Sequence, residues 1–168
     1  MARRIRPDLF ALWPAWIGFP IFGAAVLIVG VQASDGPMVT IGLGLIALNI
    51  AIVLDHAYFT TLGVEGDSLV LRSRFGLHEE RLPVGSIQRI DAKRYPTTHG
   101  GTLSAPNLVA RGRADTLKVN TKPYRRADLR DLIVSLRALN PSIELDEYWA
   151  AVVDGRDPGS EVVARSRW

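Results

Sequence analysis

Two long uncharged stretches at the front of the chain constrain its fold most. No Asp, Glu, Lys, Arg or His occurs between Asp8 and Asp35 or between Asp35 and Asp55, and these gaps are 26 and 19 residues long. The hydrocarbon core of a bilayer is about 30 Å thick, and roughly 20 apolar helical residues cross it. The sequence therefore predicts a transmembrane helical hairpin in residues 1–57, with helices at about residues 11–31 and 38–56.

A cleaved signal peptide is the alternative interpretation of the N-terminus. Arg3, Arg4 and Arg6 suit a positively charged leader. The apolar run that follows is longer than the usual core of a signal peptide, and residues 31–34 (Val-Gln-Ala-Ser) make a mediocre cleavage site. The second apolar stretch begins at once, which favours the hairpin.

The distribution of basic residues predicts the orientation of this hairpin. Arg3, Arg4 and Arg6 precede the first helix, whereas the connector at residues 32–37 has one acid and no base. Basic residues flanking membrane helices are retained on the cytoplasmic side. We therefore expect both termini in the cytoplasm and the turn outside.

One polar residue, Asn49, lies in the middle of the second predicted helix. It either bonds to a helix of a partner or forms a hydrogen bond within the hairpin, which is worth of order 1 kcal/mol. Before Asp55 at the end of the second span, neither predicted span contains Asp, Glu, Lys, Arg or His, which argues against a proton pump or an ion carrier. Small residues that allow close helix approach are Gly18, Gly23, Gly42, Gly44, Ala47 and Ala51.

Charge is concentrated in the rest of the chain. From Asp55 onward lie 15 of the 17 acidic residues and 17 of the 20 Lys and Arg residues. The formal net charge of +3 is too small to indicate nucleic-acid binding. The chain has no cysteine, which excludes disulfides, a thiolate nucleophile and zinc–thiolate sites.

Alternating and helical patterns predict an α+β domain over residues 58–145. Short strands are expected at residues 58–64, 68–74, 79–83, 86–94, 107–111 and 116–120. The spacing of Ile87 and Ile90 breaks the alternation, which indicates a β-bulge. A helix at residues 124–140 carries an apolar stripe of Leu129, Leu132, Ile133, Leu136 and Leu139. We expect a bent antiparallel sheet or barrel of about six strands, capped by this helix.

This arrangement resembles the bacterial membrane-anchored PH-like domain proteins. The segment Leu-Val-Leu-Arg-Ser-Arg-Phe-Gly-Leu at residues 69–77 is followed by Arg-Leu-Pro-Val-Gly-Ser-Ile-Gln-Arg-Ile at residues 81–90, then by a hairpin and a closing helix. The most specific element is Leu-Pro-x-x-x-Ile-x-x-Ile from Leu82 to Ile90. The resemblance implies a PH-like fold and a binding or scaffolding role at the inner membrane.

Basic residues gather on the early strands and suggest a site for lipid headgroups. A basic residue next to a membrane gains about 1 kcal/mol near anionic lipid. The candidate headgroup residues are Arg72, Arg74, Lys93 and Arg94. The alternative is an ordinary solvated strand face, because Arg72 and Arg74 alternate with Leu69 and Leu71.

The tail at residues 146–168 holds a second candidate surface. An apolar cluster at residues 148–153 follows two acids, which suits the start of a short helix. This helix either packs on the domain or docks on a partner. In the docking interpretation the anchors are Trp149 and Trp168, since tryptophan is enriched in binding hot spots, with Asn49 as a further contact inside the membrane.

No pattern in the chain predicts catalysis or a cofactor. Metal-binding histidine spacings, nucleophile elbows and phosphate-binding glycine motifs are all missing from the sequence. We expect a non-enzymatic, membrane-anchored binding or scaffold protein without cofactor or metal, as an accessory subunit or assembly factor of a membrane complex or as a homo-oligomer. The alternative is a module that binds or senses anionic lipid.

Overall fold

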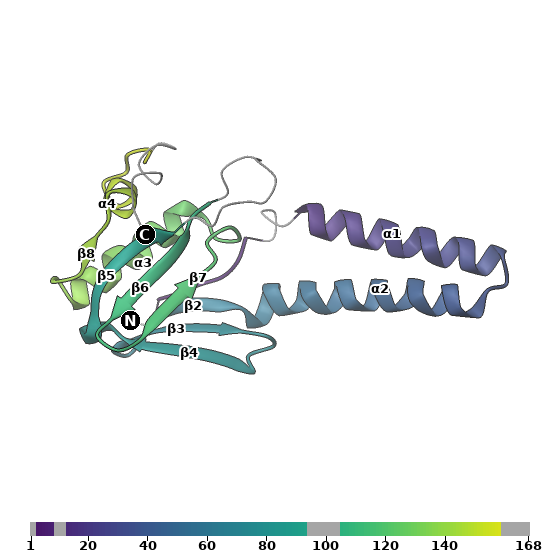
Figure 1. Ribbon diagram of the computed structural model, residues 1–168, viewed down its shortest axis with the longest axis horizontal. Helices are drawn as coiled ribbons and strands as arrows, with labels where there is room; N and C mark the ends of the chain where they lie inside the picture. Colours follow the sequence, from purple (N-terminus) through teal and green to yellow (C-terminus); the bar gives the residue numbers. More distant parts are fainter. Residues whose placement is uncertain (1–2, 9–12, 94–104, 159–168) are drawn as a thin grey trace.

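Two long helices project from an α+β domain in the computed structural model, which describes residues 3–8, 13–93 and 105–158 (Figure 1). Helices α1 (Trp13–Gln32) and α2 (Gly36–Leu54) lie side by side and are joined by a short turn. The Asp35 side chain accepts a hydrogen bond from the Met38 amide at 3.1 Å and thereby caps α2. Pro37 in the first turn loses no helical hydrogen bond.

The second helix ends later than the sequence predicted. A π-helical turn, Asp55–Phe59, continues α2, and the Thr60 amide donates to the Asp55 carbonyl at 2.8 Å. The predicted strand at residues 58–64 therefore begins only at Thr61. Tyr58 and Phe59 belong to the end of the helix, because the apolar helical run carries on past the first charged residue.

Eight strands in the described residues form two four-stranded sheets. The first sheet is antiparallel with the order β1-β2-β3-β4; the second has the order β7-β6-β5-β8, in which only β8 is parallel to its neighbour. The strands are β1 (Arg3–Ile5), β2 (Thr61–Glu65), β3 (Ser68–Ser73), β4 (His78–Pro83), β5 (Ile87–Lys93), β6 (Asn107–Gly112), β7 (Thr116–Val119) and β8 (Glu144–Leu145).

The α+β class and most elements agree with the sequence prediction. The expected bulge lies between Ile87 and Arg89, where the register of β5 against β6 shifts. Sequence alternation did not reveal β1 or β8, because three and two residues are too short to carry a period. Helix α3 (Arg126–Leu139) buries four members of its predicted stripe, whereas Leu139 at its end is exposed.

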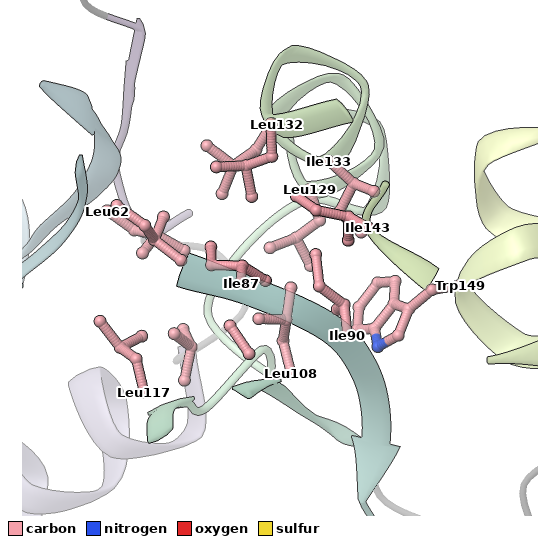
Figure 2. Packing of buried hydrophobic residues seen from close by; sticks show 14 of the residues in the cluster. Leu62, Ile87, Ile90, Leu108, Leu117, Leu129, Leu132, Ile133, Ile143 and Trp149 are labelled. Carbon is pink, nitrogen blue, oxygen red and sulfur yellow. The ribbon is translucent and has the colours of Figure 1, made fainter. Parts of the chain in front are cut away.

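The hydrophobic core joins both sheets to α3 and to the short helix α4 (Glu147–Val153) (Figure 2). Leu62 from the first sheet, Ile90 from the second and Leu132 from α3 converge there. Ile5, which precedes the first helix, and Trp149, which lies in the tail, belong to the same core. The predicted divisions after residues 57 and 145 thus separate segments that pack together.

Asp146 fastens the tail to the domain. Its carboxylate accepts the Trp149 amide at 2.9 Å and so caps α4, and it also accepts the Ala92 amide of β5. Burial raises the pKa of the Asp146 carboxyl, and the two amide hydrogen bonds partly oppose that rise. Trp149 is held at 1% exposure beneath this contact. Trp149 is a core residue, which fits the interpretation that the tail helix packs on the domain and not the one in which Trp149 anchors a partner.

We expect Asp146→Ala to destabilise the domain by about 2–4 kcal/mol, through loss of the cap and of the acceptor for a buried amide. Urea unfolding of the full chain in detergent micelles measures this change. The control is Asp154→Ala at the exposed far end of α4, which we expect to change stability by less than about 0.5 kcal/mol. Equal effects of the two substitutions would contradict the assigned role of Asp146.

Candidate functional site: the helix pair and its junction with the domain

Glycines let the two long helices approach closely along one narrow seam. A Cβ built on Gly42 of α2 would lie 2.7 Å from the Leu27 backbone nitrogen, and one on Gly30 of α1 would lie 2.7 Å from that of Val39. A Cβ on Gly23 would lie 3.1 Å from Ile46 Cγ1. Gly23 and Gly30 are seven residues apart, about two helical turns, so they share one face of α1.

The remaining faces of both helices expose large apolar side chains. The exposed set is Ile17, Phe19, Ile21, Phe22, Ile28, Val29 and Val31 on α1, and Ile41, Leu43, Leu48, Ile50, Ile52 and Leu54 on α2. A helix that is apolar all round belongs in a protein core or in a membrane. These helices are not in the core, since these side chains are exposed and the core cluster contains none of them.

Length and composition single out one helix as able to cross a membrane. Within the described residues, Gly36–Phe59 passes this test, and only 11% of its apolar stretch is buried in the protein. Ile17–Gln32 in α1 is apolar over a shorter length. By this test the described residues contain one helix that is able to cross a membrane, whereas the sequence predicted two spans.

Asn49 lies on the face of α2 that is covered by α1. It is 8% exposed, and Gly42, the other buried residue of α2, lies seven positions before it. Asn49 thus lies along the same seam as the glycine contacts. This position matches the interpretation of Asn49 as a residue inside the hairpin better than that of a contact for an external partner.

The base of α2 is tied to the turn between β3 and β4 (residues 74–77). The Phe75 amide donates to the Asp55 carboxylate at 2.6 Å, and the Phe75 and Phe59 ring centroids are 5.5 Å apart. Figure 1 shows this turn beside the C-terminal end of α2, which lies nearest the domain. The predicted strands at residues 68–74 and 79–83 leave room for a turn here, but the sequence does not reveal its contact with the helix, because Asp55 and Phe75 are 20 residues apart.

An ion-pair network occupies the basic strand face. Arg72 donates to both carboxylate oxygens of Glu65 and, at 2.6 Å, to Glu79, its partner across the strands. Arg4 of β1 lies 2.9 Å from Glu65, and Arg81 pairs with Glu79. The hydrogen bond from Arg72 lowers the pKa of Glu65, and those from Arg81 and Arg72 lower the pKa of Glu79.

The predicted headgroup residues do not form one cluster. Arg72 is engaged by carboxylates, and Arg74 has left the strand for the turn at residues 74–77, with a φ of 53°. Lys93 is the half-buried last residue of β5. Arg94 lies outside the described residues, as does the second predicted docking residue, Trp168.

The described segments contain no group of three or more His, Asp or Glu residues placed to hold a metal ion. The Asp146 carboxylate is buried, but helix capping and β5 use both of its oxygens. The groups with shifted pKa values in the network around Arg72 are paired charges on a strand face.

We expect Gly42→Ala to destabilise the helix pair by about 1–3 kcal/mol, because the new methyl group must push the backbone of α1 away. Thermal unfolding of the full chain in mild detergent measures the change. Gly44→Ala is the matched control, since a Cβ there meets no atom within 4 Å and alanine favours the helix. A destabilisation as large for Gly44→Ala as for Gly42→Ala would refute the close seam.

Comparison with known proteins gives no match: no family model, no curated protein and no solved structure is similar to the chain. The resemblance to PH-like proteins therefore remains a prediction from the sequence pattern.

Proposed function

We propose that this chain is a non-enzymatic binding or scaffold protein anchored in the bacterial inner membrane. In this proposal α1 and α2 cross the membrane as a hairpin, and a PH-like domain is held on the cytoplasmic face. The protein acts as an accessory subunit or assembly factor of a larger integral membrane complex.

The observation that carries the proposal is the apolar surface of two helices that leave and re-enter one sheet. Strand β1 precedes α1, strand β2 follows α2, and these two strands are paired, with Ile5 opposite Leu62. If α2 crosses a bilayer toward the domain, α1 must cross it in the opposite direction, because the chain leaves the first sheet before α1 and returns to it after α2. This argument supports two spans although α1 alone is the weaker candidate.

The distribution of contacts favours a membrane protein as the partner. The seam between α1 and α2 covers one face of each helix, which leaves their outer faces open to lipid or to other helices. Gly18 of α1 and Gly44 of α2 have open space where a Cβ would stand. Such small residues allow a further helix to pack closely.

We expect the protein, when extracted gently from its native membranes, to retain a membrane protein at fixed stoichiometry or a second copy of itself. Mass spectrometry of the purified complex identifies what is retained. Gly44→Leu fills open space on the outer face of α2 and should lower the recovery of that partner. The seam between α1 and α2 should stay intact in this variant. A strict monomer without any retained protein would count against the proposal.

Recognition of anionic lipid is the second candidate function, and the position of Arg74 favours it. This arginine is exposed in the turn that the Phe75 amide ties to Asp55 at the base of α2, and within the residues that the structure describes its side chain forms no ion pair. The Arg72 guanidinium, in contrast, already satisfies two carboxylates. A headgroup at Arg72 would have to displace these carboxylates. The turn is therefore a better candidate for headgroup binding than the strand face.

We expect Arg74→Gln to lower the amount of anionic lipid retained after gentle extraction, by about fivefold for a contact worth about 1 kcal/mol. Quantitative lipid mass spectrometry measures the retained lipid. Arg72→Gln, the matched change on the ion-paired strand, should leave it unchanged. If Arg72→Gln has the larger effect, the strand face is the lipid site and the turn is not.

A further inference from the structure

The turn between β3 and β4 presents apolar side chains to solvent. Leu77 is 89% exposed, and Phe75 is also exposed. Arg74, Phe75 and Gly76 have φ values of 53°, 57° and 76°. Left-handed backbone is costly for a bulky residue such as phenylalanine, of order 1–3 kcal/mol. The chain thus holds two large apolar side chains outward at the cost of backbone strain.

Two contacts fix this turn to the helix. The Phe75 amide donates to Asp55 at 2.6 Å, and the Phe75 ring packs against Phe59, whose ring centroid is 5.5 Å away. Within the turn, the Leu77 amide donates to the Arg74 carbonyl at 3.0 Å. The turn therefore has a defined position along the axis of α2, at the level of Asp55. It cannot move away without breaking the hydrogen bond to Asp55.

The length of α2 relates that position to the bilayer. At about 1.5 Å per residue, its 19 residues extend about 28 Å, close to the roughly 30 Å of a hydrocarbon core. Asp55, the first ionisable residue after α2, then lies at the boundary between acyl chains and headgroups. Tyr58 and Phe59 follow at the level of the headgroups, where aromatic side chains are favoured.

We propose that the turn at residues 74–77 inserts into the interface of the same bilayer leaflet through which α2 emerges. Leu77 and Phe75 enter the upper acyl region, and Arg74 lies among the phosphate groups. This proposal rests on the membrane anchoring by α2 proposed above. It adds a second point of contact that fixes the tilt and rotation of the whole domain over the membrane.

The chemistry of the turn fits a lipid surface. Interfacial elements bury apolar side chains about 5–10 Å into the boundary between headgroups and acyl chains. Arg74 borders the apolar pair, and a cation beside an apolar tip suits anionic headgroups. The Phe75 ring lies beside Phe59 at the end of α2, so the exposed apolar surface of the turn adjoins that of the helix.

Spin labels on the full chain in lipid nanodiscs test this arrangement. The chain has no cysteine, so that Leu77→Cys, Leu48→Cys and Ala114→Cys each carry one label without a background. Leu48 reports on the middle of α2, and Ala114 lies in the exposed turn between β6 and β7, which Figure 1 shows at the end of the domain remote from the helices. Collision rates with oxygen and with a water-soluble nickel chelate give the depth of each label.

The proposal predicts more oxygen than nickel collisions at residues 48 and 77 and the reverse at residue 114. A label at His78, with Leu77 retained, should show reduced nickel access as well, which removes dependence on the Leu77 substitution. Water exposure at residues 77 and 78 with a lipid-exposed residue 48 would overturn the insertion while the anchor stands. Water exposure at residue 48 would instead overturn the anchoring itself.

Discussion

The pairing of β1 with β2 is the constraint on which the rest of the structure depends. These strands lie directly before α1 and after α2, and Arg3, Arg4 and Ile5 pair with Val64, Gly63 and Leu62. The chain must therefore leave the domain and return to the same sheet. The two helices meet this requirement by running in opposite directions, and glycines on their facing sides allow the close approach.

The same constraint connects the helix pair to the domain more firmly than a flexible linker would. The π-helical turn continues α2 up to Phe59, and β2 begins two residues later. On the other side, Asp8 pairs with Arg125 at 2.7 Å, just before α3. Asp55 holds the β3–β4 turn against the helix. A displacement of the helix pair would therefore also move the sheet.

Periodic patterns in the sequence accounted for the long or regular elements. The uncharged stretches predicted α1 and α2, the alternation predicted most strands, and the stripe from Leu129 to Leu136 predicted the buried face of α3. Contacts between distant segments were not predictable in this way. Asp146 accepts a hydrogen bond from the amide of Ala92, 54 residues away. This contact holds the tail against β5, and Trp149 of the tail belongs to the core.

The candidate site shows the same limit. A list of arginines cannot reveal that Arg72 faces Glu65 and Glu79, because this depends on strand register. Likewise, the sequence placed Arg74 at the end of a predicted strand, whereas in the structure it belongs to the turn that also exposes Phe75 and Leu77. Their exposure, together with the contact to Asp55, directs attention from the strand face to the base of α2.

Cysteine labelling of the two sides of the membrane tests most directly whether α1 and α2 form a transmembrane hairpin. Single cysteines at Ala33, in the turn between α1 and α2, and at Ala114, in the domain, can be labelled in spheroplasts with a maleimide that does not cross membranes. The account predicts labelling of residue 33 in intact spheroplasts and of residue 114 only after lysis. Labelling of both residues, or of neither, before lysis would contradict a hairpin that crosses the membrane twice and carries its domain on the cytoplasmic side.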